Sequence, residues 1–248
     1  MTALPSGIDA YYSNIRDLSE KVVINQRSLL TEVAGKMAAV VTAGRRIFIF
    51  GTGHSHMMAE EAFYRAGGMA AAVPVFYPAL MLHEHAGLSG QLERSAGLAK
   101  PILERYAPQT GEMIFIFSNS GVNYLPVEMA QVSKEMGLLV VGVCSKAYSA
   151  VAPLSALGVR LEEVSDYTID NYGLPGDAQV DLPGLDWRVG PVSTLMGALI
   201  WNCLLTETMF LVTEMGLTPP VIVSHNLPGA VEHNRDLLNY WRQHNPHL

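Results

Sequence analysis

Apolar side chains near the start of the chain recur at the spacing of one helix face. The run over residues 8–43 begins with Ile8, Tyr11 and Ile15 and stops at Gly44. Glycine is common just past the end of a helix. The spacing therefore predicts a helical lead-in to the fold.

The pattern then changes to short, continuously apolar runs. The first is Ile-Phe-Ile-Phe at 47–50, between a basic pair and a glycine. Such runs are typical of parallel strands that are covered on both faces. Similar runs follow at 72–76, 113–117, 138–143 and 167–169. Segments of helical spacing lie between them at 57–66, 98–106 and 126–136.

Strands that alternate with helices predict an α/β fold, a three-layer αβα sandwich around an open parallel sheet. Residues 172–191 are rich in Gly and Pro and predict a loop with a short hairpin. Residues 192–212 are long and apolar enough for a membrane span, but they include Asn202 and Glu207. Because such side chains are costly in lipid, we expect a buried core or interface helix.

A last helix is expected over 231–241. With no repeat and no clear boundary, residues 1–248 are expected to form a single domain, with a helical lead-in over about 1–45 and a helical extension over about 190–248.

Composition excludes several partners. Hydrophobic residues make up 49% of the chain, and 16 basic against 23 acidic residues give a net charge of −7. No basic block could follow a nucleic-acid backbone. Cys144 and Cys203 lie in apolar runs and suit a reducing compartment. No secretory signal is apparent at the N-terminus. We expect a cytoplasmic protein with no nucleic-acid or membrane partner.

Residues 51–56, Gly-Thr-Gly-His-Ser-His, follow the first predicted strand directly. Ligands of open parallel sheets bind beyond such strand ends. The segment has the first two glycines of a dinucleotide fingerprint, but His56 stands where the third should be. No acidic residue ends a second strand about 20 residues on. NAD is therefore disfavoured, and no cofactor is expected.

Residues 118–123, Ser-Asn-Ser-Gly-Val-Asn, follow the third predicted strand. Hydroxyls, an amide and a permissive glycine at the start of a helix make a neutral anion cradle that suits a phosphate monoester. Alternatively, these side chains only cap the following helix.

Together these turns resemble the sugar isomerase (SIS) domain, over roughly residues 33–171. The matching motifs are Gly-x-Gly-x-Ser at 51–55 and Ser-x-Ser-Gly at 118–121, with Asn123 in place of the usual Ser or Thr. Leu-Met-Leu-His-Glu at 80–84, with a downstream Ile-Asp-Asn, resembles an uncharacterised branch of SIS proteins.

This resemblance implies a five-stranded, Rossmann-like parallel sheet, a phosphosugar ligand, and a homodimer or higher oligomer with its active site near a subunit interface. It also implies that Ser55, Ser118, Ser120 and Asn123 contact the phosphate or nearby sugar hydroxyls. The full set of candidate binding residues is Gly53, His54, Ser55, Ser118, Asn119, Ser120, Gly121 and Asn123.

Phosphosugar isomerisation needs a base beside the carbonyl and donors for the enediolate. His83, Glu84 and His85 follow the second strand on the ligand side, and Glu84 is the first candidate for acid or base, with His83 beside it. His54 and His56 flank the first turn, where an imidazolium could neutralise the anion; either could instead be an ordinary surface histidine. Because histidines two apart in extended chain point to opposite sides, a metal on His83 and His85 is the weaker interpretation, and none is expected.

Glu60-Glu61 resemble the Ala-Glu-Glu of heptose-phosphate isomerases in the SIS family, whose second glutamate is a catalytic base. In those enzymes the pair lies about one helical turn further from the serine. Adjacent helical residues point about 100° apart, so at most one faces the site, and either or both could be solvated.

Two segments near the C-terminus bear on ring opening. Arg-Val-Gly-Pro at 188–191 resembles the Lys-His-Gly-Pro of glucosamine-phosphate synthases, with valine at their ring-opening histidine. A replacement donor could come from His225 or His233 of a neighbouring subunit.

The sequence thus predicts a phosphosugar enzyme that removes the carbon 2 proton of a sugar phosphate, an (N-acetyl)hexosamine 6-phosphate in our interpretation. Elimination and aldose–ketose isomerisation both stay open. The alternative from another class is a non-catalytic phosphosugar sensor.

Overall fold

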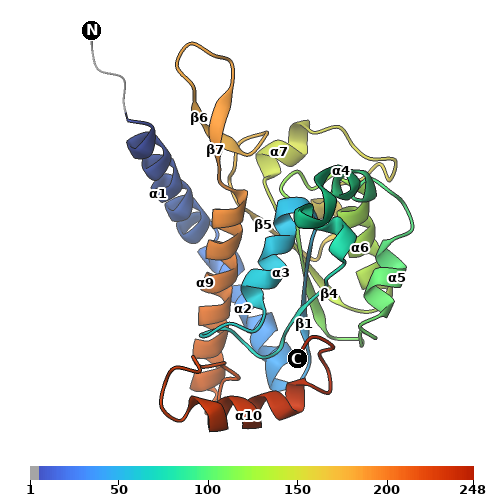
Figure 1. Cartoon of the computed structure of the whole chain (residues 1–248), viewed down its shortest axis with the longest axis vertical. Helices are drawn as coiled ribbons and strands as arrows, with labels where there is room; N and C mark the ends of the chain where they lie inside the picture. The colour runs from blue at the N-terminus through green and yellow to red at the C-terminus, as the bar shows by residue number, and fades with distance from the viewer. Residues whose placement is uncertain (1–5) are drawn as a thin grey trace.

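The computed structural model describes residues 6–248, so the N-terminal expectation lies partly outside the described residues. A five-stranded parallel sheet with the order β2-β1-β3-β4-β5 forms its centre (Figure 1). The strands are β1 (Ile47–Gly51), β2 (Ala72–Pro74), β3 (Met113–Phe117), β4 (Leu139–Cys144) and β5 (Tyr167–Asp170). The predicted α/β class and parallel sheet are confirmed.

Successive side chains in each strand point to opposite faces of the sheet, and both faces are covered. Ile49 and Phe115 pack in one apolar cluster, and Phe48 and Ile114 in the other. The first cluster includes residues of α1 (Gly7–Asn25), α2 (Arg27–Thr42), α3 (Met57–Ala62), α9 (Ser193–Glu214) and α10 (Ala230–Trp241). The second includes residues of α5 (Ala99–Glu104), α6 (Tyr124–Glu135) and α8 (Leu161–Val164). The three layers follow from this two-sided burial.

Shorter elements lie at the ends of the strands. They are the 3-10 turns η1 (Gly53–His56) and η2 (Pro78–Leu80), and the helices α4 (Leu82–Leu92) and α7 (Lys146–Val151). A predicted short hairpin is confirmed as β6 (Ala178–Asp181) and β7 (Arg188–Pro191). The Tyr11 hydroxyl of α1 donates to Pro191 O at 2.8 Å and holds the hairpin against α1.

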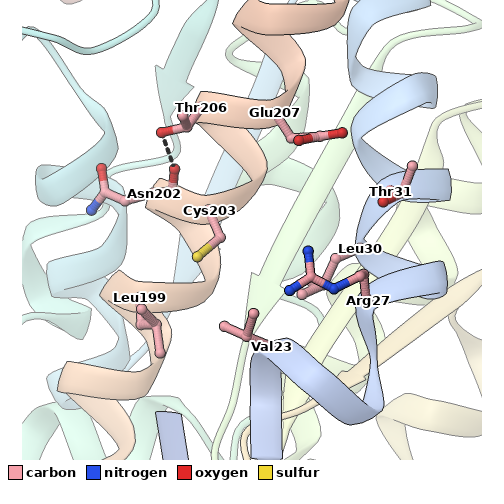
Figure 2. Close-up of a pocket in the computed structure, with 9 residues that line it drawn as sticks. All are labelled: Val23, Arg27, Leu30, Thr31, Leu199, Asn202, Cys203, Thr206 and Glu207. Atoms are coloured by element: carbon pink, nitrogen blue, oxygen red, sulfur yellow. Dashed lines mark hydrogen bonds between the residues drawn. The ribbon is translucent and has the colours of Figure 1, made fainter. Parts of the chain in front are cut away.

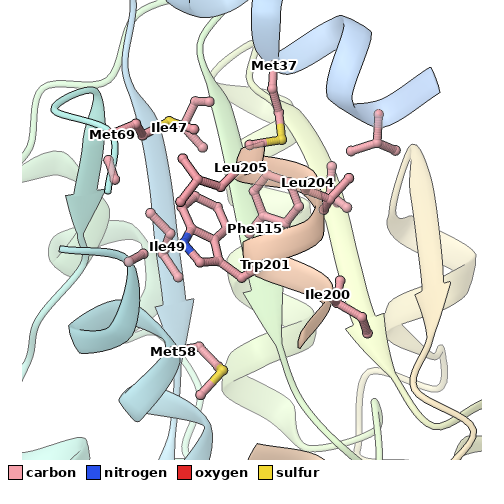
Figure 3. Close-up of a cluster of buried hydrophobic side chains, with 14 of the residues drawn as sticks. Met37, Ile47, Ile49, Met58, Met69, Phe115, Ile200, Trp201, Leu204 and Leu205 are labelled. Atoms are coloured by element: carbon pink, nitrogen blue, oxygen red, sulfur yellow. The ribbon is translucent and has the colours of Figure 1, made fainter. Parts of the chain in front are cut away.

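Helix α9 is the long apolar helix expected from the sequence. Trp201 packs edge-on against Phe115, with ring centroids 5.5 Å apart (Figure 3). By length and composition α9 is the one described helix that could span a membrane, and half of its most apolar window is buried inside the fold. That burial supports the core-helix interpretation.

The helical lead-in differs from the expected single run. It breaks at Gln26, whose side chain is bonded to β5 instead of to its own helix. Gln26 Nε2 donates to Asp170 O at 2.7 Å, and Asp170 N donates to Gln26 Oε1 at 2.8 Å. The break thus places a buried amide beside the carboxyl end of the sheet.

Two further helices differ from the sequence expectation. Helix α3 ends at Ala62, four residues early, because Phe63 is extended and Tyr64 has a positive φ of 45°. Helix α4 was not expected. Two glycines and a kink at His85 hide its helical pattern.

A buried ion pair lies at the amino end of the sheet. Arg46 Nε donates to Glu112 Oε1 at 2.6 Å, and its other nitrogens donate to backbone carbonyls that include His244 O at 3.0 Å. Asn245 Nδ2 donates to Ala72 O at 3.3 Å. The end of the described chain is therefore bonded to the starts of β1 and β2.

Candidate functional site

The strand order creates a crevice between β1 and β3. After β1 the chain enters α3, which packs on one face of the sheet, and after β3 it enters α6 on the other. The two connections diverge at this point, which is where open α/β sheets bind ligands. These connections are the two motif turns, here called the first loop (51–56) and the second loop (118–123).

The first loop needs both of its glycines. A side chain at Gly51 would collide with the main chain of Ser55, and Gly53 has a φ of +57°. Ser55 N donates to Thr52 O at 3.0 Å, and the His56 ring contacts Gly53 O through Nδ1. The result is a tight turn that places Ser55 beside the crevice.

The second loop is fixed by neighbouring strands. Ser118 N donates to Val143 O at 3.0 Å, and Ser145 N donates to Asn119 O at 2.9 Å. Gly121 has a φ of +63°, a conformation that glycine adopts without strain. The loop's side chains are thus presented from a rigid main chain.

A narrow slot with a free volume of about 10 Å³ lies between residues of both loops. Its polar lining residues are Ser55, Ser118, Asn119, Asn171, Ser193 and Thr194. Within residues 6–248, none of the side chains that line it is ionisable. The slot therefore offers neutral hydrogen-bond donors.

Hydrogen bonds orient the two amides of the slot. Gly173 N donates to Asn171 Oδ1 at 2.8 Å, so the Asn171 amide group must turn its NH₂ the other way. That NH₂ donates to Asn119 Oδ1 at 2.8 Å. The Asn119 NH₂ is left as a donor for a ligand.

The beginning of α9 closes the slot opposite the loops. Asp177, at a positive φ of 73°, accepts from Ser193 N at 2.8 Å and from Ser193 Oγ at 2.7 Å. A carboxylate at a helix N-terminus is stabilised by the unpaired N–H groups there. Asp177 thereby anchors the segment that carries Ser193 and Thr194.

Ser120 and Asn123 do not line the slot. They face a separate hollow of about 440 Å³ together with Arg94, Tyr124 and Tyr148. The second loop thus separates the two spaces, with Ser118 and Asn119 on one side and Ser120 and Asn123 on the other. The structure therefore brings Ser55 together with Ser118 and Asn119, but not with Ser120 and Asn123.

The candidate histidines lie beside the first loop. The ring centroids of His56 and His83 are 5.9 Å apart, and His56 Nε2 is 3.4 Å from Glu60 Oε1. His54 is exposed. His56 is buried. Of the two histidines in the first loop, it is the one that lies beside His83 at the start of α4.

Glu84 and Glu61 lie away from the slot. Glu84 is exposed in the first turn of α4, and neither glutamate lines the slot or the hollow. Glu61 is paired with Arg65 and accepts from Asn202 Nδ2 at 2.9 Å. Glu61 therefore points toward α9.

The two distant histidine candidates also have local roles. His233 contacts Val221 O through Nε2 at 2.8 Å, and the His225 ring lies 6.5 Å from the Tyr64 ring. Both are exposed and neither lines the slot.

Two carboxylates at the site were missed in the sequence. Asp177 lies in the Gly/Pro-rich stretch, and Glu93 lies beyond the unexpected helix α4. Thr52 Oγ1 of the first loop donates to Glu93 Oε2 at 3.0 Å. A carboxylate that follows a helix and contacts a loop about 40 residues away leaves no local sequence signal.

A separate groove lies between α2 and α9, away from both loops. Its volume is about 410 Å³. Figure 2 shows Arg27 and Cys203 reaching into it from opposite walls, with Asn202 on the α9 side. Burial raises the pKa of the Cys203 thiol, so this thiol is less readily ionised than in water.

Comparisons with known proteins identify the family of this chain. A model of the SIS domain matches residues 10–145. A UPF0309 protein from Brucella anthropi is 40% identical over 226 residues, which cover 90% of this chain and 92% of the relative. A UPF0309 protein from Brucella abortus is 39% identical over 219 residues, 88% of this chain and 89% of the relative.

Solved structures show the same fold. A phosphoheptose isomerase from Francisella tularensis aligns with a TM-score of 0.55 at 11% identity, over 81% of this chain and 95% of that one. One from Neisseria gonorrhoeae aligns with a TM-score of 0.52 at 14% identity, over 81% and 96%. The family match covers more than half of the chain and the sequence relatives nearly all of it, so the protein belongs to the SIS domain family and, within it, to the UPF0309 proteins.

Proposed function

We propose that this protein binds a sugar phosphate in the crevice between β1 and β3. The observation that carries the proposal is the slot, which joins Ser55 of the first loop to Ser118 and Asn119 of the second. Hydroxyl and amide donors at a strand end suit the oxygens of a phosphate monoester. A second polar space, the hollow lined by Ser120 and Asn123, lies on the other side of the second loop.

The reaction in this proposal begins with removal of the carbon 2 proton of an (N-acetyl)hexosamine 6-phosphate. The enolate can take a proton at carbon 1, which gives an imine at carbon 2 that water hydrolyses to the ketose with release of the amine, in the aldose–ketose direction. Alternatively it expels the carbon 3 oxygen, which leaves as water or an alcohol after protonation, in an elimination. His83, Glu84 and the buried His56 lie at the start of α4 and in the first loop and are the candidates for proton transfer. Glu61 is the second choice of base, because its carboxylate is engaged by Arg65 and Asn202.

One observation favours a sensor as the second candidate function. Neither Glu84 nor Glu61 lines the slot or the hollow. A protein that only binds a sugar phosphate needs the donors but no base.

Proton exchange separates the two functions. The protein is incubated in D₂O with N-acetylglucosamine 6-phosphate or glucosamine 6-phosphate, and the carbon 2 proton is followed by NMR. Loss of that signal, or a new product, supports the enzyme. Measurable binding without exchange supports the sensor, and no binding of either compound contradicts the proposed function.

The proposal includes self-association and a cytoplasmic location. Large apolar side chains of α1 and the hairpin are strongly exposed, among them Ile8 at 81%, Tyr12 at 67% and Trp187 at 69%. Exposed apolar patches favour a protein partner. Light scattering on the purified protein measures the subunit number, and a monomer at micromolar concentration would contradict this part.

A further inference from the structure

Glu93, which lies outside the slot, contacts both the first loop and the helix that follows the second loop. Thr52 is buried at the end of β1, and its hydroxyl donates to Glu93 Oε2 at 3.0 Å. The Glu93 side chain is only 16% exposed, although glutamate is mostly found on the surface. This bond holds the first loop to the end of α4.

The same residue also holds the element that follows the second loop. Leu125 N, in the first turn of α6, donates to the main-chain oxygen of Glu93 at 3.0 Å. The first N–H groups of a helix have no partner within the helix. Glu93 supplies one and thereby fixes the start of α6 relative to α4.

A third contact extends from Glu93 to the hollow. Glu93 Oε1 pairs with Arg94 Nη1 at 2.9 Å. Arg94 lines the hollow with Ser120 and Asn123. The carboxylate of Glu93 therefore pairs with a guanidinium at the edge of the hollow.

The position of Glu93 is unfavourable without these partners. It is the residue that ends α4, where the helix dipole disfavours negative charge. Burial of a carboxylate is also costly unless it is paired. The side-chain contacts to Thr52 and Arg94 offset these costs, whereas the contact to Leu125 is made by the main chain.

We infer that Glu93 is a positioning residue that sets the distance between the first and second loops through Thr52 and Leu125. This inference rests on the proposed function, because the spacing matters only if one oxyanion contacts both loops. A phosphate binds tightly only if Ser55, Ser118 and Asn119 are all within hydrogen-bond distance of it at the same time.

The test measures binding of inorganic phosphate and of N-acetylglucosamine 6-phosphate by calorimetry. Thr52→Val keeps the shape of the side chain but removes the donor, and Glu93→Ala removes the acceptor. Each variant is expected to raise Kd for both probes about 10- to 150-fold, the range for loss of one charge-assisted hydrogen bond. The double variant is expected to bind no more weakly than the weaker single variant, since both remove one contact.

Two controls separate positioning from general destabilisation. Thr52→Ser restores the hydroxyl and is expected to restore wild-type Kd. Glu104→Ala removes a carboxylate from the end of α5, where it pairs with Lys100 at the surface, and is expected to leave Kd unchanged. Circular dichroism shows whether each variant is folded. If Glu93→Ala does not fold, the comparison of Thr52→Val with Thr52→Ser still tests the inference.

The outcomes distinguish the inference from the proposed function. Wild-type protein that binds neither probe overturns both. Two results would overturn the role of Glu93 while leaving the proposed function intact. In the first, wild type binds the probes and Thr52→Val and Glu93→Ala bind with the same Kd. In the second, Thr52→Ser binds as weakly as Thr52→Val.

Discussion

Asn171→Asp tests the direction in which the amide donors of the slot point. A carboxylate has nearly the same shape as the amide and still accepts from Gly173 N, but it has no N–H to give to Asn119 Oδ1. Asn119 must then turn its NH₂ toward the new carboxylate, which leaves its oxygen facing the ligand. The substitution removes one donor from the slot and adds a negative charge.

The size of the effect follows from the geometry. The Asn171–Asn119 bond is 2.8 Å, and with the width of the amide and a second hydrogen bond the new charge lies roughly 7 Å from a bound phosphate. Two like charges at that distance repel by about 2.4 kcal/mol at an effective dielectric constant of about 20. The lost hydrogen bond adds about 1 kcal/mol. We expect a total near 3 kcal/mol, or Kd weaker on the order of 10²-fold.

The assay is calorimetric titration of wild type and variant with N-acetylglucosamine 6-phosphate near neutral pH. Asn239→Asp is the matched control, because it adds the same charge at an exposed position of α10 and is expected to leave Kd nearly unchanged. Equal affinity of Asn171→Asp and wild type would refute the assigned amide orientation. An equal loss in both variants would show that net charge, not the slot, is responsible.

Three further substitutions and a labelling experiment test separate parts of the structure. Ser120→Ala is expected to weaken sugar phosphate binding by about 1–3 kcal/mol, measured by calorimetry, if the hollow holds part of the ligand; unchanged Kd would exclude it. Glu84→Gln is expected to keep binding and lower turnover by about 10²–10⁴-fold in the NMR assay, and full turnover would assign the base elsewhere. Arg46→Met leaves the Glu112 carboxylate buried without its cation, so the free energy of unfolding in urea should fall by about 3–5 kcal/mol, and a loss under about 1 kcal/mol contradicts this. Burial raises the pKa of Cys144 to about 12, so its thiol should resist aromatic disulfide reagents near pH 8 until the protein unfolds; because the unfolded chain releases this proton first, stability should decline as the pH rises above about 9.

The sheet and its two loops could be predicted from the sequence because they have local causes. Residues 113–117 form an unbroken apolar run, and such a run has one stable place in a three-layer fold. Glycines at 51 and 53 are required by the main chain of the turn itself. These signals lie within the segments that they describe.

The division of the site could not be predicted, because it depends on contacts between distant segments. Ser118 and Ser120 belong to one motif, yet they face the slot and the hollow respectively. Glu93 contacts residues 41 positions before it and 32 after it. Its helix, α4, contains two glycines and a kink, so helical periodicity gave no sign of it.

The bond between Arg46 and His244 O joins residues 198 positions apart. During synthesis on a ribosome, Arg46 emerges long before this carbonyl exists, and the same holds for Ala72 and Asn245. The amino end of the sheet therefore stays incomplete until translation has nearly ended. Nascent chains stalled before residue 244 should expose this edge and depend on chaperones more than the finished protein does.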